Sequence, residues 1–165
     1  MRHFTNQFMQ INVAILTVSD TRTVENDFSG QEIQALLRET NHKIVNYEIV
    51  KDDVKEITSI VLAWCVDLEI NTIIINGGTG FSQRDTTYEA VSFLLEKEMK
   101  GFGELFRSLS FQAIGANAMF SRSVAGCRNK TAIYALPGST NAVKLGMESL
   151  ILPTVHHFVE ELHRS

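Results

Sequence analysis

The chain has 165 residues, of which 44% are hydrophobic and 21% charged, with a net charge of −4. This predicts one domain over residues 1–165, with residues 1–10 as a loose N-terminal segment. The acidic balance and the lack of a basic stripe argue against nucleic acid as a partner. No apolar run reaches the roughly 18 residues of a membrane helix, so we expect no membrane partner, no signal peptide and a cytoplasmic location. Cys65 and Cys127 have no CxxC partner and are expected to be reduced thiols rather than disulfide or zinc ligands.

The first half of the chain alternates strand-like and helix-like patterns. Ser29 is placed to cap a first helix, and Asp52 and Asp53 are placed to cap a second. The second helix carries an apolar stripe from Ile57 to Leu68, in which Trp64 is expected to belong to the core. Three runs are typical of strands: residues 11–18, 43–50 and 71–76.

The second half continues the alternation. A third helix is expected around Tyr88 to Leu95, and Thr86 with Glu89 fits a capping box at its start. Pro153 should kink or split the last helix, because proline removes a backbone hydrogen bond. The remaining expected elements, in order, are a break at 101–104, a helix over 105–114, a strand over 130–136 and a helix from Thr140.

Strand–helix alternation with buried strands predicts an α/β fold: a three-layer sandwich with a mostly parallel sheet and helices on both faces. In such sheets ligands bind beyond the carboxyl ends of the strands. Four polar or glycine-rich loops follow the predicted strands: Ser19-Asp20, Asp52-Asp53, residues 77–85 and Pro137-Gly138-Ser139. We expect these loops to converge on one binding site.

The glycine loop, Gly77-Gly78-Thr79-Gly80, lets a ligand approach the backbone closely, and its successive amides can form an anion nest. It matches neither a Walker A loop nor a GxGxxG fingerprint, and a simple tight turn stays an alternative.

Asp52 and Asp85 are each either helix caps or ligands of a hard cation. If both face one cleft, a cation between them relieves their repulsion, and that geometry suits a magnesium-bound triphosphate and phosphoryl or nucleotidyl transfer. Ser121 and Arg122 offer a hydroxyl and a guanidinium to an anionic ligand, with a surface turn or strand as the alternative. No HExxH or GxSxG motif supports a zinc protease or a serine hydrolase.

The ordered set of loops resembles the MogA/MoaB family of molybdenum-cofactor biosynthesis proteins, which includes the G domains of gephyrin and of its plant counterpart. The resemblance spans about residues 11–160 and is closest to the MoaB branch. The matching pieces are Thr17-Val18-Ser19-Asp20, Gly77-Gly78-Thr79-Gly80-Phe81, Arg84-Asp85, Thr87-x-Glu89-Ala90, Gly101-Phe102-Gly103-Glu104, Ser121-Arg122, Ala125-Gly126 and Leu136-Pro137-Gly138-Ser139.

The resemblance implies a MogA-like fold, a homotrimer or homohexamer, and a molybdopterin adenylyltransferase that uses Mg²⁺ and ATP to make adenylyl-molybdopterin and pyrophosphate. The product would pass to a molybdate-insertion protein. By the same resemblance, Asp52 and Asp85 are the catalytic residues and magnesium ligands. The implied substrate-binding residues are Ser19, Asp20, Gly77, Gly78, Thr79, Gly80, Arg84, Glu104, Ser121, Arg122, Pro137, Gly138 and Ser139.

Two other interpretations stay open. One is a non-catalytic molybdopterin carrier or scaffold of the same pathway, which would bind molybdopterin without releasing pyrophosphate. The other is an unrelated flavodoxin-like nucleotide binder.

Overall fold

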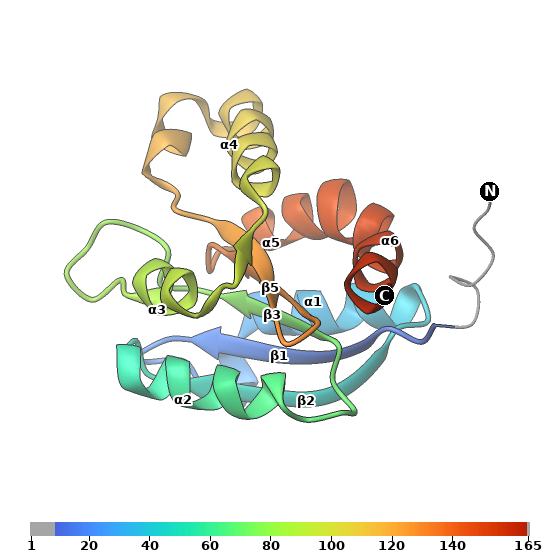
Figure 1. Cartoon of the computed structure of the whole chain (residues 1–165). Helices are drawn as coiled ribbons and strands as arrows, with labels where there is room; N and C mark the ends of the chain where they lie inside the picture. The colour runs from blue at the N-terminus through green and yellow to red at the C-terminus, as the bar shows by residue number, and fades with distance from the viewer. Residues whose placement is uncertain (1–8, 165) are drawn as a thin grey trace.

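The structure, a computed structural model, describes residues 9–164 and contains a six-stranded mixed sheet in the order β2-β1-β3-β6-β5-β4 (Figure 1). The four strands β2, β1, β3 and β6 are parallel, β5 pairs with β6 in antiparallel fashion, and β4 pairs with β5 in antiparallel fashion. In chain order the strands are β1 Asn12–Val18, β2 Lys43–Val50, β3 Thr72–Asn76, β4 Lys97–Glu98, β5 Val124–Arg128 and β6 Thr131–Leu136. The sheet is therefore mostly parallel, as expected.

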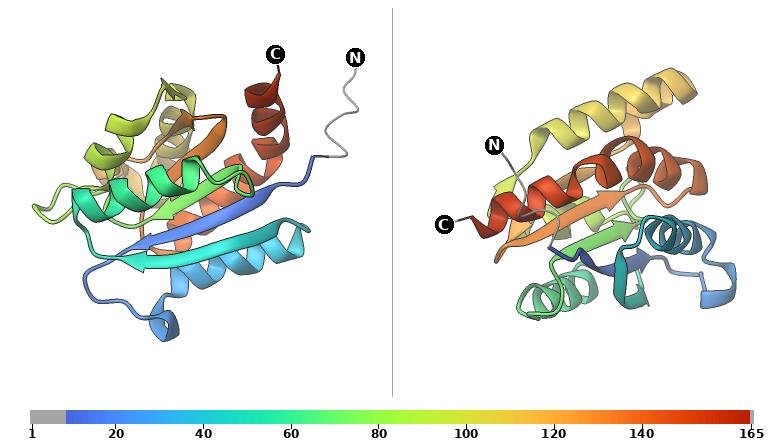
Figure 2. Two further views of the ribbon diagram at one scale, coloured as in Figure 1. Left: turned by 60° about the horizontal axis from the view of Figure 1, so that its bottom comes forward. Right: turned by 90° about the vertical axis from the view of Figure 1, so that its right-hand side faces the viewer.

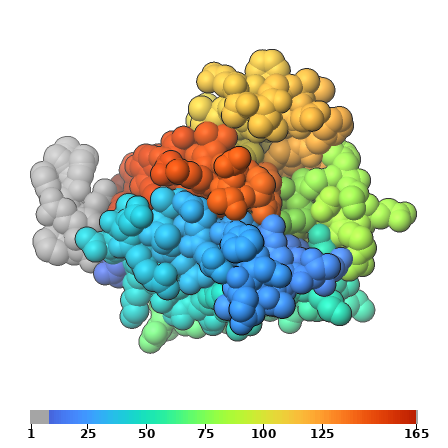
Figure 3. Space-filling view, turned by 180° about the vertical axis from the view of Figure 1, so that it is seen from behind, coloured from blue at the N-terminus to red at the C-terminus, as the bar shows by residue number. Residues whose placement is uncertain are grey.

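Helices cover both faces of this sheet, and Figure 2 shows α1 and α2 on opposite sides of it. One face carries α1 Phe28–Glu39, α5 Thr140–Gly146, the π-helical turn η4 Met147–Ile151 and α6 Leu152–His163. The other carries α2 Val54–Cys65 and α3 Thr87–Leu94. The helix α4 Lys100–Ile114 and the turn η3 Gly115–Phe120 project from this body (Figure 3), and a short turn, η2 Val24–Asn26, precedes α1. The three-layer arrangement is confirmed.

Alternation along the buried strands divides the core into two clusters. Val13 and Ile15 of β1 pack with α1 and α6, whereas Ala14 and Leu16 pack with α2 and α3. Successive side chains of a strand point to opposite faces, so a strand covered on both sides must be apolar throughout. Trp64 lies in the second cluster, as predicted.

Several local expectations are wrong. The first helix is capped by Asp27, whose side chain accepts from the Gly30 N–H, and Ser29 lies inside the helix. Leu68 is fully exposed because α2 ends at Cys65. Thr86 precedes α3 but makes no capping hydrogen bond with its side chain, so the capping box does not form.

Residues 101–104 do not interrupt the helical pattern as expected, because α4 begins at Lys100 and includes them. Burial of Phe102 and Phe106 offsets the low helix propensity of the two glycines in this turn. Pro153 lies at the start of α6, directly after the π-helical turn, so the last helix changes its winding there instead of ending.

Most of the segment expected to be loose, residues 1–10, falls on residues 1–8, outside the described part of the chain. Among residues 9–164, no helix has the length and apolar character needed to cross a bilayer.

Candidate functional site

Four loops meet at the carboxyl edge of the parallel strands. The Ser19 N–H donates to Val50 O (2.8 Å), and the Gly77 N–H donates to Leu136 O (2.9 Å), so neighbouring strands are tied where they end. A Cβ added to Gly138 would lie 3.2 Å from the Gly77 Cα, which shows how closely those two loops approach. The predicted convergence of these loops is present at this edge.

The glycine loop adopts a backbone that only glycine tolerates well. Gly77 has φ +100° and Gly78 has φ +72°. A Cβ on Gly77 would lie 2.2 Å from Val18 O, and a Cβ on Gly78 would lie 2.3 Å from Thr87 Oγ1. The two glycines are therefore required by backbone conformation and by close packing.

The carbonyl groups of this loop all point into the protein. Thr87 donates its hydroxyl to Gly77 O (2.7 Å) and its N–H to Gly78 O (3.0 Å). Arg122 donates its N–H to Thr79 O (2.9 Å) and its Nε to Gly80 O (2.9 Å). By contrast, the N–H groups of Gly78, Thr79 and Gly80 donate to no acceptor within residues 9–164. Successive backbone N–H groups without an acceptor can form a nest that binds an anion.

Asp52 lies beneath this loop and is 6% exposed. Its Oδ1 accepts both the N–H (2.9 Å) and the hydroxyl (2.6 Å) of Thr86, which precedes α3. Its Oδ2 is 2.7 Å from the position that a Cβ on Gly78 would take. The neighbouring Asp53 is the N-cap of α2, accepting from the Glu56 N–H at 3.1 Å. The capping role thus belongs to Asp53, and Asp52 faces the loop.

Asp85 lies at the other end of the same loop. Its Oδ2 accepts the Ser82 N–H at 2.9 Å and is 2.8 Å from where a Cβ on Gly80 would be. Within residues 9–164 no hydrogen bond reaches Asp85 Oδ1 or Asp52 Oδ2. The two predicted carboxylates thus contact one loop, and each keeps an oxygen available.

This donor set fits Mg²⁺. Carboxylate oxygens are hard ligands, and magnesium usually takes one or two of them together with phosphate oxygens and water. The described residues contain no group of three or more acidic, histidine or cysteine side chains able to form an all-protein metal cage. Asp52 and Asp85 are the residues that would hold such an ion, shared with a phosphate ligand.

An exposed ion pair crosses the mouth of the site. Arg84 binds Asp20 through two parallel bonds of 2.9 Å, and Asp20 Oδ1 also accepts the Asp52 N–H at 3.1 Å. The Arg84 guanidinium is the main cause that lowers the pKa of Asp20 to about 2. This pair links the loops after β1, β2 and β3.

Behind the site lies a buried carboxylate, Asp27, that the sequence analysis did not single out. Its oxygens accept from the Thr17 hydroxyl (2.6 Å), the Tyr47 hydroxyl (2.5 Å), Arg22 (3.2 Å) and the Gly30 N–H (3.1 Å). Burial, and then the bond to Asp27, raise the pKa of Tyr47 well above its usual range. A fully buried charge needs such a complete set of partners.

Arg22 connects this carboxylate to the loop after β6. It donates to Ser29 Oγ (2.5 Å) and to Gly138 O (2.6 Å), while Ser29 donates to Asn76 at 2.6 Å. Thr17 and Asn76 are polar residues near the carboxyl ends of β1 and β3, directly after apolar runs, and that was the available signal for the network.

The other implied site residues are placed as follows. Ser19 Oγ accepts the N–H groups of Thr21 and Arg22 and shapes the first loop. Ser139 caps α5, accepting from the Ala142 N–H. Pro137 precedes Gly138 in the same loop. Ser121 is hydrogen-bonded to Ser123 (2.9 Å), and Glu104 is exposed on α4, so no described contact joins either side chain to the glycine loop.

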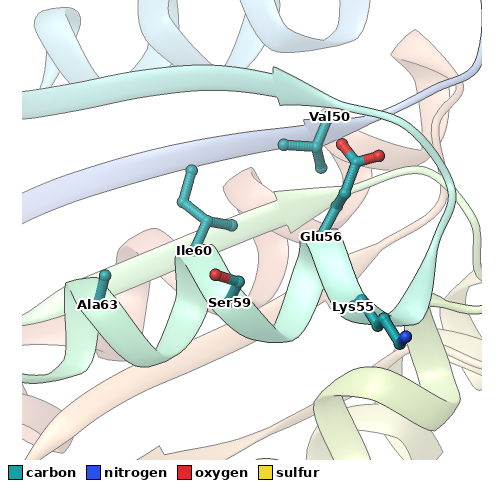
Figure 4. A pocket seen from close by; sticks show the side chains of 6 residues that line it. All are labelled: Val50, Lys55, Glu56, Ser59, Ile60 and Ala63. Atoms are coloured by element: carbon teal, nitrogen blue, oxygen red, sulfur yellow. The ribbon is translucent and has the colours of Figure 1, made fainter.

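A pocket of about 520 Å³ lies elsewhere, between α2 and the end of β2 (Figure 4). None of the residues implied in catalysis or substrate binding lines it. The lining residues are Val50, Lys55, Glu56, Ser59, Ile60 and Ala63. The loop edge, with its free amides and carboxylates, is therefore the stronger candidate site.

Comparison with known proteins agrees with this fold. Residues 14–157 match the family described as "Probable molybdopterin binding domain". "Molybdenum cofactor biosynthesis protein B" of Bacillus cereus is 48% identical over 156 residues, which cover 94% of this chain and 92% of that protein. A crystal structure of a protein of the same name superposes with a TM-score of 0.92 at 47% identity, covering 95% and 98% of the two chains. The "Molybdopterin biosynthesis enzyme MoaB" of Thermus thermophilus gives a TM-score of 0.83 at 33% identity, covering 93% and 96%. The chain therefore belongs to the MogA/MoaB family of molybdenum-cofactor biosynthesis proteins.

Proposed function

We propose that this protein acts in molybdenum cofactor biosynthesis as a molybdopterin adenylyltransferase. Family membership and the names of the relatives support the pathway. The specific reaction is supported by the geometry of the loop edge, where free amides and two carboxylates surround one glycine loop.

In the proposed reaction, an oxygen of the terminal phosphate of molybdopterin attacks the α-phosphorus of ATP. A new P–O bond forms, the bond from that phosphorus to the bridging oxygen of the β-phosphate breaks, and pyrophosphate leaves with the bond's electron pair. The products are adenylyl-molybdopterin and pyrophosphate. In phosphoryl and nucleotidyl transfer, positioning and charge neutralisation dominate the rate.

The chain's own groups supply the positioning. The N–H groups of Gly78, Thr79 and Gly80 bind phosphate oxygens of the nucleotide, and Thr87 keeps the loop carbonyls turned away. Mg²⁺, when bound, would neutralise part of the triphosphate charge. Asp52 and Asp85, whose carboxylates lie beside Gly78 and Gly80, are the residues that would hold this ion.

The single observation that carries the proposal is that the carbonyl groups of the glycine loop are hydrogen-bonded within the protein and three of its amide groups are not. Its carbonyl oxygens are bonded inward and three amides are left without acceptors, while Asp52 Oδ2 and Asp85 Oδ1 receive no hydrogen bond within the described residues. An anion at the amides together with a cation at the carboxylates satisfies both sets, and a magnesium-bound phosphate provides both.

The test follows pyrophosphate release from MgATP and molybdopterin. Asp52→Asn and Asp85→Asn keep the side-chain shape and remove the charge, so each is expected to lower kcat/KM by about 100-fold or more with little change in folding. Asp53→Asn is the matched control, because asparagine also caps a helix. Unchanged rates in both site variants would refute the assigned roles. Molybdopterin binding without pyrophosphate release would favour the carrier interpretation.

We also propose that the protein works as a homotrimer or homohexamer and passes its product to a molybdate-insertion protein. Large apolar side chains on the projecting α4 and η3 are each more than half exposed, and apolar side chains that gather on a surface often mark an interface. They are Leu105, Phe111, Ile114, Met119 and Phe120.

A further inference from the structure

Arg122 reaches the glycine loop from a distant part of the chain, between η3 and β5. Its Nε donates to Gly80 O at 2.9 Å, and its Nη2 donates to Asp85 O at 3.2 Å. Both Nη atoms bind the carboxylate of Glu89 on α3. The guanidinium thereby lowers the pKa of Glu89 below its usual range. Both ends of the segment from Gly80 to Asp85 are fixed to one side chain.

Two aromatic rings also lie close to the same guanidinium. Its carbon lies 5.0 Å from the centre of the Phe81 ring and 5.2 Å from that of Tyr88. Both distances are within the range of cation–π contacts. Four hydrogen bonds use four of the five N–H groups that an arginine offers, and the side chain is 19% exposed. Little of the guanidinium is left to meet a ligand.

The backbone of Arg122 acts on the same loop. Its N–H donates to Thr79 O at 2.9 Å, so one residue accounts for the carbonyls of both Thr79 and Gly80. In a short loop, turning consecutive carbonyls to one side leaves the N–H groups directed to the other. The peptide unit that carries the Gly80 N–H, and the carbonyl that follows it, are therefore held by a residue about 40 positions later in the chain, while Thr87 holds the two peptide units before it.

We infer that Arg122 is a positioning residue that clamps the glycine loop in its anion-binding shape and does not itself bind the anion. Glu89 and Tyr88 anchor the clamp to α3. The inference deepens the proposed function and rests on it for the identity of the anion, the phosphates of MgATP. The clamp itself concerns the protein alone.

A clamp and a direct phosphate ligand predict different behaviour of conservative variants. A direct phosphate ligand has no need of a neighbouring carboxylate, so Glu89→Gln would then keep or raise the affinity for MgATP. A clamp needs a planar fork that binds Glu89 and two carbonyls together, which an ammonium cannot supply. A clamp also makes Glu89, which carries a negative charge, necessary for binding an anion, and no direct electrostatic role predicts this.

The experiment compares Arg122→Lys, Glu89→Gln and the double variant, with Arg164→Lys as the control, since Arg164 forms exposed pairs at the end of α6. NMR-detected hydrogen exchange of the backbone amides of Arg122 and Thr87, which donate to loop carbonyls, is measured without any ligand. Titration calorimetry with MgATP then measures affinity.

We expect each single site variant to speed exchange of these amides about tenfold and to weaken MgATP binding about tenfold. The double variant should lose no more affinity than the weaker-binding of the two single variants, because Arg122 and Glu89 act as one unit. The control should match wild type. Wild-type exchange in Glu89→Gln, or an affinity for MgATP in Glu89→Gln that equals or exceeds that of wild type, would overturn the inference. Hydrogen exchange is measured without substrate. A wild-type protein that transfers no AMP would therefore refute the proposed function, while the exchange rates would still test the clamp.

Discussion

Gly78 has no room for a side chain, and its replacement by alanine tests whether the glycine loop is built as described. The residue has φ +72°, which costs an alanine about 1–2 kcal/mol. The added methyl would lie 2.3 Å from Thr87 Oγ1 and 2.7 Å from Asp52 Oδ2. Displacing the Thr87 hydroxyl breaks its bond to Gly77 O, which is worth about 1 kcal/mol. Gly78→Ala should therefore lower the free energy of unfolding by roughly 2–3 kcal/mol.

The same methyl displaces the Asp52 carboxylate, so activity should fall further than stability explains. We expect a decrease of about 100-fold in kcat at a temperature where the variant is fully folded. Urea unfolding and pyrophosphate release measure the two effects. Gly101→Ala in α4 is the matched control, because a Cβ there meets nothing within 4 Å and alanine favours a helix. Stability within about 0.5 kcal/mol of wild type in Gly78→Ala, with unchanged turnover, would refute this account of the loop.

Three further predictions address other parts of the molecule. Arg84 lowers the pKa of Asp20 to about 2 in the folded protein, so the Asp20–Arg84 pair stabilises the fold fully above the unfolded pKa near 3.8, and this stabilisation is lost as the pH falls toward 2. In Asp20→Asn the free energy of unfolding should lack this pH dependence, and an acid profile identical to that of wild type would contradict the pairing. The Tyr134 hydroxyl is buried with no partner among the described residues, so Tyr134→Phe should raise the free energy of unfolding by about 1 kcal/mol in urea, whereas a clear loss would show that the hydroxyl is bonded. Phe111→Lys on the projecting α4 should lower the mass measured by light scattering toward that of a monomer, and a wild-type protein that is already monomeric would contradict the proposed assembly.

Much of the fold could be predicted from periodicity, because β1, β3 and β6 are covered on both faces and must be apolar throughout. The antiparallel edge was harder. The sequence around residues 121–126 left a turn and a strand open, and β5 contains Gly126. The structure explains this glycine, because a Cβ there would lie 2.2 Å from Lys97 O of the adjacent β4. Close backbone approach of two distant segments leaves no periodic signal.

The candidate site was predictable to the level of loops, and less so to the level of side-chain roles. Helix-start patterns alone placed both Asp52 and Asp53 as caps of the second helix, whereas in the structure Asp52 faces the glycine loop and Asp53 caps α2. Arg122 was expected to offer its charge to a ligand, and the structure shows its donors used on Glu89 and on loop carbonyls. Such partners are 33 or more positions away, so only the folded chain reveals them.

The most direct test of the proposed function traces the α-phosphorus of ATP. Purified protein is mixed with molybdopterin, Mg²⁺ and ATP labelled at that position, and the products are separated. We predict that the label appears in adenylyl-molybdopterin in equal amount to the pyrophosphate released, and that both stop when Mg²⁺ is chelated. Label that stays in ATP while molybdopterin is bound would contradict the account.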